Sequence, residues 1–190
     1  MKIRQSLFRG LFLVSLGWSA AFAAAAVNAS GAEAELKPGS VVLIRHALAP
    51  GGGDPAQFVL NDCSTQRNLN DEGRAQARRI GKFFRQLPVP VEAVWSSQWC
   101  RTRETANLAF PGKRVDQAAF NSFFGEPDAA PAQTQAAAAL LNAWNGKGLL
   151  VVVTHQVNIT AITGVVSSSG EAVVLGRRNG AWAVTGRLTL

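Results

Sequence analysis

The two histidines of the chain stand at equivalent points of its sequence pattern, each after a run of apolar residues. His46 follows Arg45 and the apolar run 41–44, and His155 follows the run 149–154, which is apolar up to its last residue. Continuous apolar runs of this length are typical of strands buried on both faces of a sheet. Ligands bind at the carboxyl ends of such strands in open α/β sheets. We therefore expect Arg45, His46 and His155 to share one pocket.

A second arginine is expected beside this group. A weaker strand pattern over 91–95 ends in Ser96-Ser97, and the helical pattern that follows over 98–110 carries Arg101 near its amino end. Backbone N–H groups and the helix dipole favour an anion at that point. Arginine pairs bidentately with phosphate oxygens, and imidazole can attack phosphorus. Two guanidinium groups and two imidazoles together predict a pocket for a phosphoryl group.

The other elements are expected from periodicity and turn residues. Asn70 suits the N-cap of a helix whose first turn carries two acidic residues, which favour helix initiation. Asn179-Gly180 tolerates the positive φ of a tight hairpin turn. Strands that alternate with helices predict one three-layer α/β/α domain over residues 36–190, with a mainly parallel sheet and a C-terminal hairpin. The further expected helices span 71–87 and 132–144, and the hairpin strands span 171–177 and 181–190.

The first 26 residues have the pattern of a cleavable secretory signal. Lys2, Arg4 and Arg9 precede the apolar run 11–26, whose small residues supply Ala-x-Ala cleavage sites. We therefore expect a signal peptide over residues 1–26, a periplasmic or secreted protein, and contact with the membrane only during export. An uncleaved anchor is the alternative, but the alanine-rich end of the run favours cleavage. Removal of the three basic residues lowers the formal charge from +7 to +4.

Charge and residue counts exclude several other classes of protein. The positive charge suits an anionic ligand, but no basic stripe interleaved with aromatic residues indicates nucleic-acid binding. Two histidines are too few for a three-histidine metal site, and no metal or other cofactor is expected. A cysteine phosphatase needs Cys-x5-Arg, whereas Leu69 and Ala106 stand six residues after Cys63 and Cys100. The sequence also contains neither a Gly-x4-Gly-Lys-Ser/Thr phosphate loop nor a Gly-x-Ser-x-Gly nucleophile motif.

Cys63 and Cys100 are candidates for a disulfide. Export to an oxidising compartment would allow them to pair, and two separate buried thiols are the alternative. Cys100 directly precedes Arg101, and Cys63 lies between the first strand and the next helix. A bond between them would tie that connection to the arginine segment of the pocket.

Four segments of the chain resemble, in order, those of the histidine phosphatase superfamily, the phosphoglycerate mutase-like enzymes. The resemblance covers roughly residues 40–160 and implies a phosphoglycerate mutase-like fold. Residue by residue, it implies that His46 is the phosphorylated nucleophile, that Arg45 and Arg101 clamp the phosphate, and that His155 is a further phosphate ligand. The matching segments are 41–47, 68–77, 96–106 and 153–155.

The chain also departs from the family pattern. Ala47 stands where many members have glycine, and this substitution by alanine is familiar in the short phosphohistidine-phosphatase-like branch. Gln156 stands where acid phosphatases and phytases have the aspartate that protonates the leaving group. Mutase-like members carry a glutamate after the second arginine helix. Glu126 is the candidate here and Asp128 the second, with a solvated loop carboxylate or no acid at all as alternatives. Arg67 is a candidate for a further phosphate contact, with a surface role as the alternative.

These features predict an exported phosphatase that needs no metal. Its partner would be a phosphorylated substrate: a phosphomonoester, or a phospho-group on an envelope glycolipid or a protein. Hydrolysis would pass through an N-phosphohistidine on His46. A non-catalytic phosphate or glycan-phosphate binding module is the alternative from another class. A phosphomutase is less favoured, because its phosphorylated sugar acids are cytosolic.

Overall fold

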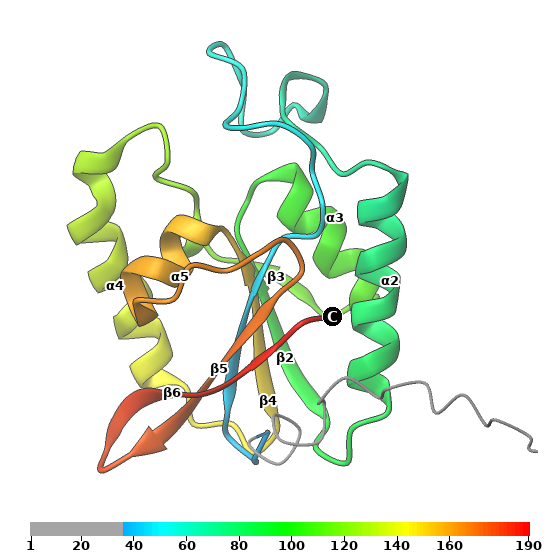
Figure 1. Ribbon diagram of the computed structural model, residues 1–190. Coiled ribbons are helices and arrows are strands. Elements are labelled where there is room, and N and C mark those ends of the chain that lie inside the picture. Colours follow the sequence, from blue (N-terminus) through cyan, green and yellow to red (C-terminus); the bar gives the residue numbers. More distant parts are fainter. Residues whose placement is uncertain (1–35) are drawn as a thin grey trace, which may run out of the picture.

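A six-stranded mixed sheet forms the centre of the domain in the computed structural model, which describes residues 36–190 (Figure 1). The predicted signal peptide over residues 1–26 lies outside the described residues. The strand order is β3-β2-β4-β1-β5-β6. Strands β1 to β4 run parallel, and β5 and β6 form the predicted antiparallel hairpin. The strands are β1 Val41–Arg45, β2 Val91–Ser96, β3 Arg114–Asp116, β4 Leu149–Thr154, β5 Ala172–Arg178 and β6 Ala181–Leu188.

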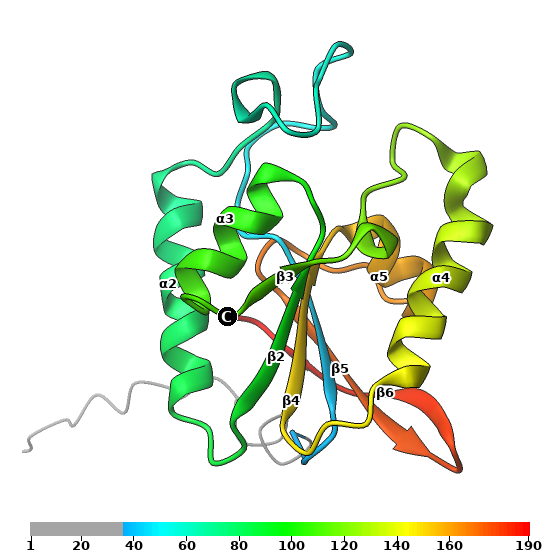
Figure 2. The same ribbon diagram turned by 180° about the vertical axis from the view of Figure 1, so that it is seen from behind.

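Helices cover both faces of the sheet, which confirms the predicted three-layer α/β/α architecture (Figures 1 and 2). Helices α2 and α3 pack on one face, and α4 and α5 pack on the other. None of the helices within residues 36–190 is long and apolar enough to span a membrane. The helices are α2 Asp71–Arg85, α3 Cys100–Ala109, α4 Ala130–Ala143 and α5 Gln156–Thr163, and the short 3-10 helices are η1 Cys63–Thr65, η2 Ala118–Phe120 and η3 Pro127–Ala129.

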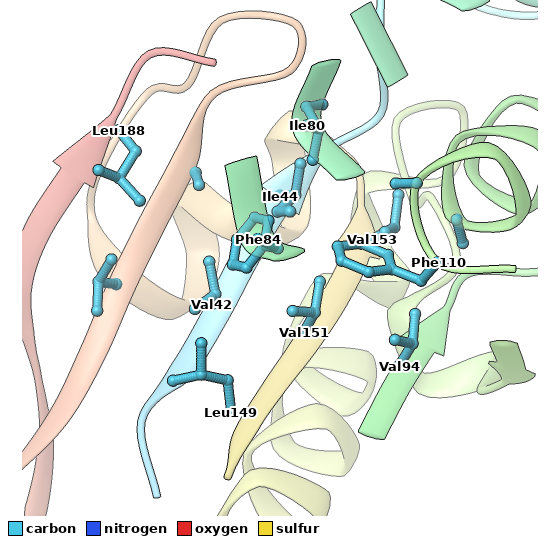
Figure 3. Close-up of a cluster of buried hydrophobic side chains, with 14 of the residues drawn as sticks. Val42, Ile44, Ile80, Phe84, Val94, Phe110, Leu149, Val151, Val153 and Leu188 are labelled. Atoms are coloured by element: carbon cyan, nitrogen blue, oxygen red, sulfur yellow. The ribbon is translucent and has the colours of Figure 1, made fainter. Parts of the chain in front are cut away.

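The continuous apolar run of β1 is explained by burial on both faces. Val42 and Ile44 point to the α2 and α3 side, where they join Ile80, Phe84 and Phe110 in one core cluster (Figure 3). The intervening residues of β1 join a second cluster under α4 and α5. Each such side chain contributes about 1.5–3 kcal/mol when it is removed from water. The two clusters hold the central strands, and therefore their carboxyl ends, in a fixed position.

The pairing register of the two central strands places the histidines side by side. Ile44 pairs with Val153 and Arg45 pairs with Thr154 in the parallel ladder of β1 and β4. The N–H of His46 then donates to the carbonyl of Thr154 at 2.9 Å. His46 and His155 therefore leave the sheet at the same edge, as the sequence pattern predicted.

Most element boundaries agree with the sequence pattern, and the differences are one or two residues. Helix α3 begins at Cys100 and not at residue 98, because Trp99 is extended and its N–H donates to the Ser97 hydroxyl at 3.2 Å. Helix α2 ends at Arg85, whereas the sequence pattern ran to residue 87. The hairpin turn has the predicted positive φ, 51° at Asn179 and 82° at Gly180. Strand β3 and helix α5 were not predicted.

Candidate active site

A pocket of about 670 Å³ opens at the carboxyl ends of the parallel strands. Strand β1 brings Arg45 and His46 to its wall, β4 brings His155, and the first turn of α3 brings Arg101. The structure thus gathers the four side chains that the sequence predicted to meet. The segment between β1 and α2, cyan in Figure 1, lies over the same end of the sheet and completes the wall.

His46 is held in one tautomer. Its ring is buried, and Nδ1 lies 2.8 Å from the carbonyl oxygen of Ala47. Because a carbonyl only accepts hydrogen bonds, Nδ1 carries the proton and the lone pair is on Nε2. Burial, followed by the positive charge of Arg101, lowers the pKa of His46 to about 3. The ring is therefore neutral near pH 7, which is the state a nucleophile requires.

His155 is neutral as well, but both of its ring nitrogens face partners. Nδ1 lies 3.4 Å from Nη2 of Arg101, and Nε2 lies 2.8 Å from the hydroxyl of Ser97. A guanidinium group only donates, so Nδ1 accepts and Nε2–H donates to Ser97. Burial, and then the charge of Arg101, lowers the pKa of His155 well below its ordinary value. The two imidazole centroids are 5.6 Å apart. Of the two rings, His46 is thus the better placed nucleophile.

Arg45 and Arg101 both bring an unsatisfied buried donor to this pocket. Nη1 of Arg45 donates to the Ser167 carbonyl at 2.8 Å, and Nη1 of Arg101 donates to Asp54 at 2.7 Å. The Nε–H of each arginine is buried and has no hydrogen-bond partner within residues 36–190. Burial and the neighbouring Arg101 lower the pKa of Arg45, yet arginine keeps its charge in proteins. Buried charged donors without partners fit an anion with several acceptor oxygens.

Arg67 lies in the pocket wall, and two of its nitrogens are already engaged. Nε donates to the carbonyl of Gly53 at 2.9 Å, and Nη1 donates to the carbonyl of Ala49. The side chain therefore braces the loop that follows β1. The side chain is half-buried. Its predicted contact with phosphate stays a prediction.

The two candidate leaving-group acids are placed differently. Glu126 is exposed and lines the pocket from the loop that precedes η3. Asp128 is exposed on η3 itself and lies outside the pocket wall. This placement keeps Glu126 as the first candidate.

Cys63 and Cys100 form a disulfide, the first of the two alternatives left open by the sequence. Their Cα atoms are 5.6 Å apart, and the bond joins η1 to the first residue of α3. Beside it, the N–H of Cys100 donates to Oε1 of Gln66 at 2.9 Å. The segment between β1 and α2 is thus fastened next to Arg101.

The sequence reasoning missed Asp54 and Trp99, which support the arginine side of the pocket. Asp54 pairs with Arg101, and the Nε1–H of Trp99 donates to Asp54 at 3.0 Å. Burial raises the pKa of Asp54, but hydrogen bonds and charge from Arg101, the Arg67 N–H and Trp99 lower it by more. The available signal was an acid that directly follows a run of three glycines, residues 51–53, in the connection between β1 and α2. In the part of the chain that the structure describes, no group of three or more His, Cys, Asp or Glu residues is arranged to hold a metal ion.

Comparison with known proteins relates the chain to one family. Residues 41–120 match the family model described as the histidine phosphatase superfamily (branch 1). No curated protein sequence matches the chain. The matched range contains Arg45, His46, Arg67 and Arg101, while His155 lies beyond it.

Solved structures with low sequence identity share the fold. The Agrobacterium tumefaciens protein assigned as the phosphohistidine phosphatase SixA is 19% identical, with a TM-score of 0.59 over 80% of this chain and 99% of its own. A phosphoserine phosphatase of Entamoeba histolytica, solved with 3-phosphoglyceric acid, is 12% identical, with a TM-score of 0.60 over 80% of this chain and 97% of its own. The phosphoglycerate mutase of Thermus thermophilus is 18% identical, with a TM-score of 0.52 over 80% of this chain and 99% of its own. Phosphatases and a mutase therefore share this fold.

Proposed function

We propose that the chain is a phosphatase of the histidine phosphatase superfamily, whose family model matches residues 41–120, and that it forms an N-phosphohistidine on His46. The observation that carries the proposal is the state of the His46 ring. Its Nδ1–H is engaged by the Ala47 carbonyl, which leaves the Nε2 lone pair of a neutral ring in a pocket lined by Arg45 and Arg101. A neutral imidazole with a free Nε2 lone pair can attack phosphorus, and the neighbouring guanidinium groups can bind the phosphoryl oxygens.

The first half of the reaction transfers the phosphoryl group to the protein. Nε2 of His46 attacks phosphorus, the P–N bond forms, and the P–O bond to the leaving group breaks with its electron pair on the departing oxygen. The buried Nε–H groups of Arg45 and Arg101 donate to the phosphoryl oxygens. His155 is a further phosphate ligand in this proposal, and its Nε2–H would turn from the Ser97 hydroxyl to the phosphate. The Ala47 carbonyl stabilises the positive ring by holding the Nδ1 proton.

The second half of the reaction releases phosphate. Water attacks phosphorus, the P–N bond breaks, and Nε2 regains its lone pair. Glu126, at the pocket wall, protonates the departing oxygen in the first half and takes a proton from the water in the second. A substrate whose leaving group is a stable anion needs this acid less. All groups in the scheme belong to the protein, so we propose that no metal takes part.

We propose further that the protein is exported and acts in the periplasm or outside the cell. The secretory pattern of residues 1–26 supports this location, and so does the Cys63–Cys100 disulfide, because disulfides persist in oxidising compartments. Phosphorylated envelope glycolipids, phosphoproteins and small phosphate esters are the substrates available there. Phosphomutase activity fits this location poorly.

Hydrolysis of an aryl phosphate by the purified protein tests the proposal. We expect steady release of inorganic phosphate that continues in the presence of a chelator, and a loss of at least about a thousandfold in His46→Ala. Asp71→Asn is a suitable control, because Asp71 is exposed on α2 and its ion pair within residues 36–190 is with Arg74 of the same helix. Phosphate binding without turnover by the wild type would instead identify a binding module. Isomerisation of a phosphorylated sugar acid without phosphate release would identify a mutase.

A further inference from the structure

A carboxylate stands inside a pocket that is otherwise built for an anion. The side chain of Asp54 is 10% exposed, and it accepts hydrogen bonds from three donors. Oδ1 accepts from Nη1 of Arg101 at 2.7 Å and from the Arg67 N–H at 3.1 Å, and Oδ2 accepts from Nε1 of Trp99 at 3.0 Å. The negative charge of Asp54 repels a phosphate in this pocket. We therefore asked what the carboxylate contributes to the pocket that offsets this repulsion.

The atoms that Asp54 engages decide which edge of Arg101 remains available. A guanidinium group on an arginine side chain has an Nε–H that points to the same side as Nη2, while Nη1 lies on the other side. Nη1 of Arg101 donates its hydrogen bond to Asp54. Nη2 carries two hydrogens, of which one faces Nδ1 of His155 at 3.4 Å and one remains, and the buried Nε–H has no partner among the residues the structure describes. The edge formed by Nε and Nη2 is therefore the one that can bind two phosphoryl oxygens.

Asp54 is itself held firmly in place. Arg67 anchors the preceding loop through the carbonyls of Gly53 and Ala49. The Cys63–Cys100 bond fastens the later part of the same segment to α3, one residue before Arg101. The carboxylate is thus fixed by its own loop and by the helix that carries the arginine.

Both oxygens of Asp54 must accept, because all three partners donate. An amide in the same place has one accepting oxygen and one donating nitrogen. Its nitrogen would therefore face the N–H of either Trp99 or Arg101, and two donors cannot form a hydrogen bond with each other. Asp54→Asn therefore disturbs the hydrogen bonds at nearly constant side-chain volume.

We propose that Asp54 is a positioning residue that orients the Arg101 guanidinium group, so that its Nε–Nη2 edge receives the transferring phosphoryl group. This inference rests on the proposed phosphatase function. Asp54 acts through Arg101 and not on the substrate. Its removal should therefore slow the chemical step more than it weakens the binding of phosphate, since the lost carboxylate no longer repels the anion.

A double-mutant cycle tests the inference. Asp54→Asn should lower kcat/KM by about tenfold to a hundredfold, mainly through kcat, with inhibition by inorganic phosphate weakened by less than about threefold. In the Arg101→Lys background the same substitution should cost less than about threefold, because the edge it orients is already gone. Asp116→Asn is the matched control. Asp116, on β3, accepts at 2.9 Å from Arg103, which lies on α3 like Arg101. Asp116 is outside the pocket wall, so the substitution should leave kcat/KM within about twofold.

Three results would overturn the inference. The first is an unchanged kcat/KM in Asp54→Asn, and the second is an equal fold loss in both backgrounds, which would mean that Asp54 acts independently of Arg101. The third is independent of activity: rotation of the Arg101 guanidinium group, followed by ¹⁵N NMR, that is equally slow in the wild type and in Asp54→Asn. We expect slow rotation in the wild type and faster rotation in the variant. A wild type without turnover would contradict the proposed function alone, and the NMR comparison would still decide the role of Asp54.

Discussion

Breaking the Cys63–Cys100 disulfide should lower both the stability of the domain and the efficiency of its pocket. The two cysteines are 37 residues apart in sequence. The entropy of closing a loop of this length in the unfolded chain corresponds to about 4 kcal/mol at 25 °C. For a domain of this size, each kcal/mol shifts the melting temperature by about 2–4 °C, so Cys63→Ser should melt about 8–16 °C below the wild type.

The pocket should respond because the disulfide ends one residue before Arg101. Without the bond, the segment that carries Asp54 and Arg67 is less fixed when phosphate enters. More ordering entropy is then lost on binding, and KM for an aryl phosphate should rise. Glu126, on a different loop, should be unaffected by this change.

Thermal unfolding with and without reductant is the assay. Wild type and Cys63→Ser should differ without reductant and should melt together once the wild type is reduced, and Cys100→Ser should reproduce the loss. A difference below about 3 °C without reductant would refute the reasoning. So would the titration of two free thiols in wild-type protein that has been denatured without reduction.

Three further predictions concern the charged groups of the pocket. Arg101→Lys keeps the charge but loses the planar fork, so kcat/KM should fall about tenfold to a thousandfold, and an unchanged value would remove Arg101 from the site. The pKa of His46 is lowered to about 3, and that of His155 is also lowered. Below about pH 6.5 these two histidines therefore bind protons in the unfolded chain but stay neutral in the folded chain. The free energy of unfolding in urea should therefore fall as the pH is lowered from about 7 to about 4, and it should fall less in His46→Gln; equal slopes would contradict the assignment. Glu126→Gln should slow hydrolysis of an alkyl phosphate at least about tenfold while an aryl phosphate with a good leaving group is nearly unaffected, and equal effects on both substrates would argue against an acid role.

The parts of the fold that were predictable are those in which the sequence pattern and burial coincide. Strands β1 and β4 read as continuous apolar runs because neighbouring helices cover both faces of the sheet at these strands. Strand β3 was missed because it has three residues, lies at the sheet edge and is only partly buried. Helix α5 was missed because its eight residues are too short for a clear periodicity. Local pattern thus identified the core elements but not the short ones, which tertiary contacts stabilise.

The same distinction applies to the site. Arg45, His46 and His155 could be placed together from sequence, because strand ends share one edge of a parallel sheet. The pairing of Asp54 with Arg101 spans 47 residues and depends on the path of a glycine loop, which no periodicity encodes. The tautomer of His46 likewise depends on the position of a backbone carbonyl. Such features follow from the folded geometry and not from residue spacing.

The account depends most directly on where the phosphoryl group is attached during turnover. Brief mixing of the protein with substrate, followed by mass spectrometry under conditions that avoid acid, should locate one phosphate on His46. His46→Ala should carry none under the same conditions, while Asp71→Asn should be labelled like the wild type. Turnover accompanied by phosphate on a serine such as Ser97, or by label retained in His46→Ala, would contradict the assignment of His46 as the nucleophile.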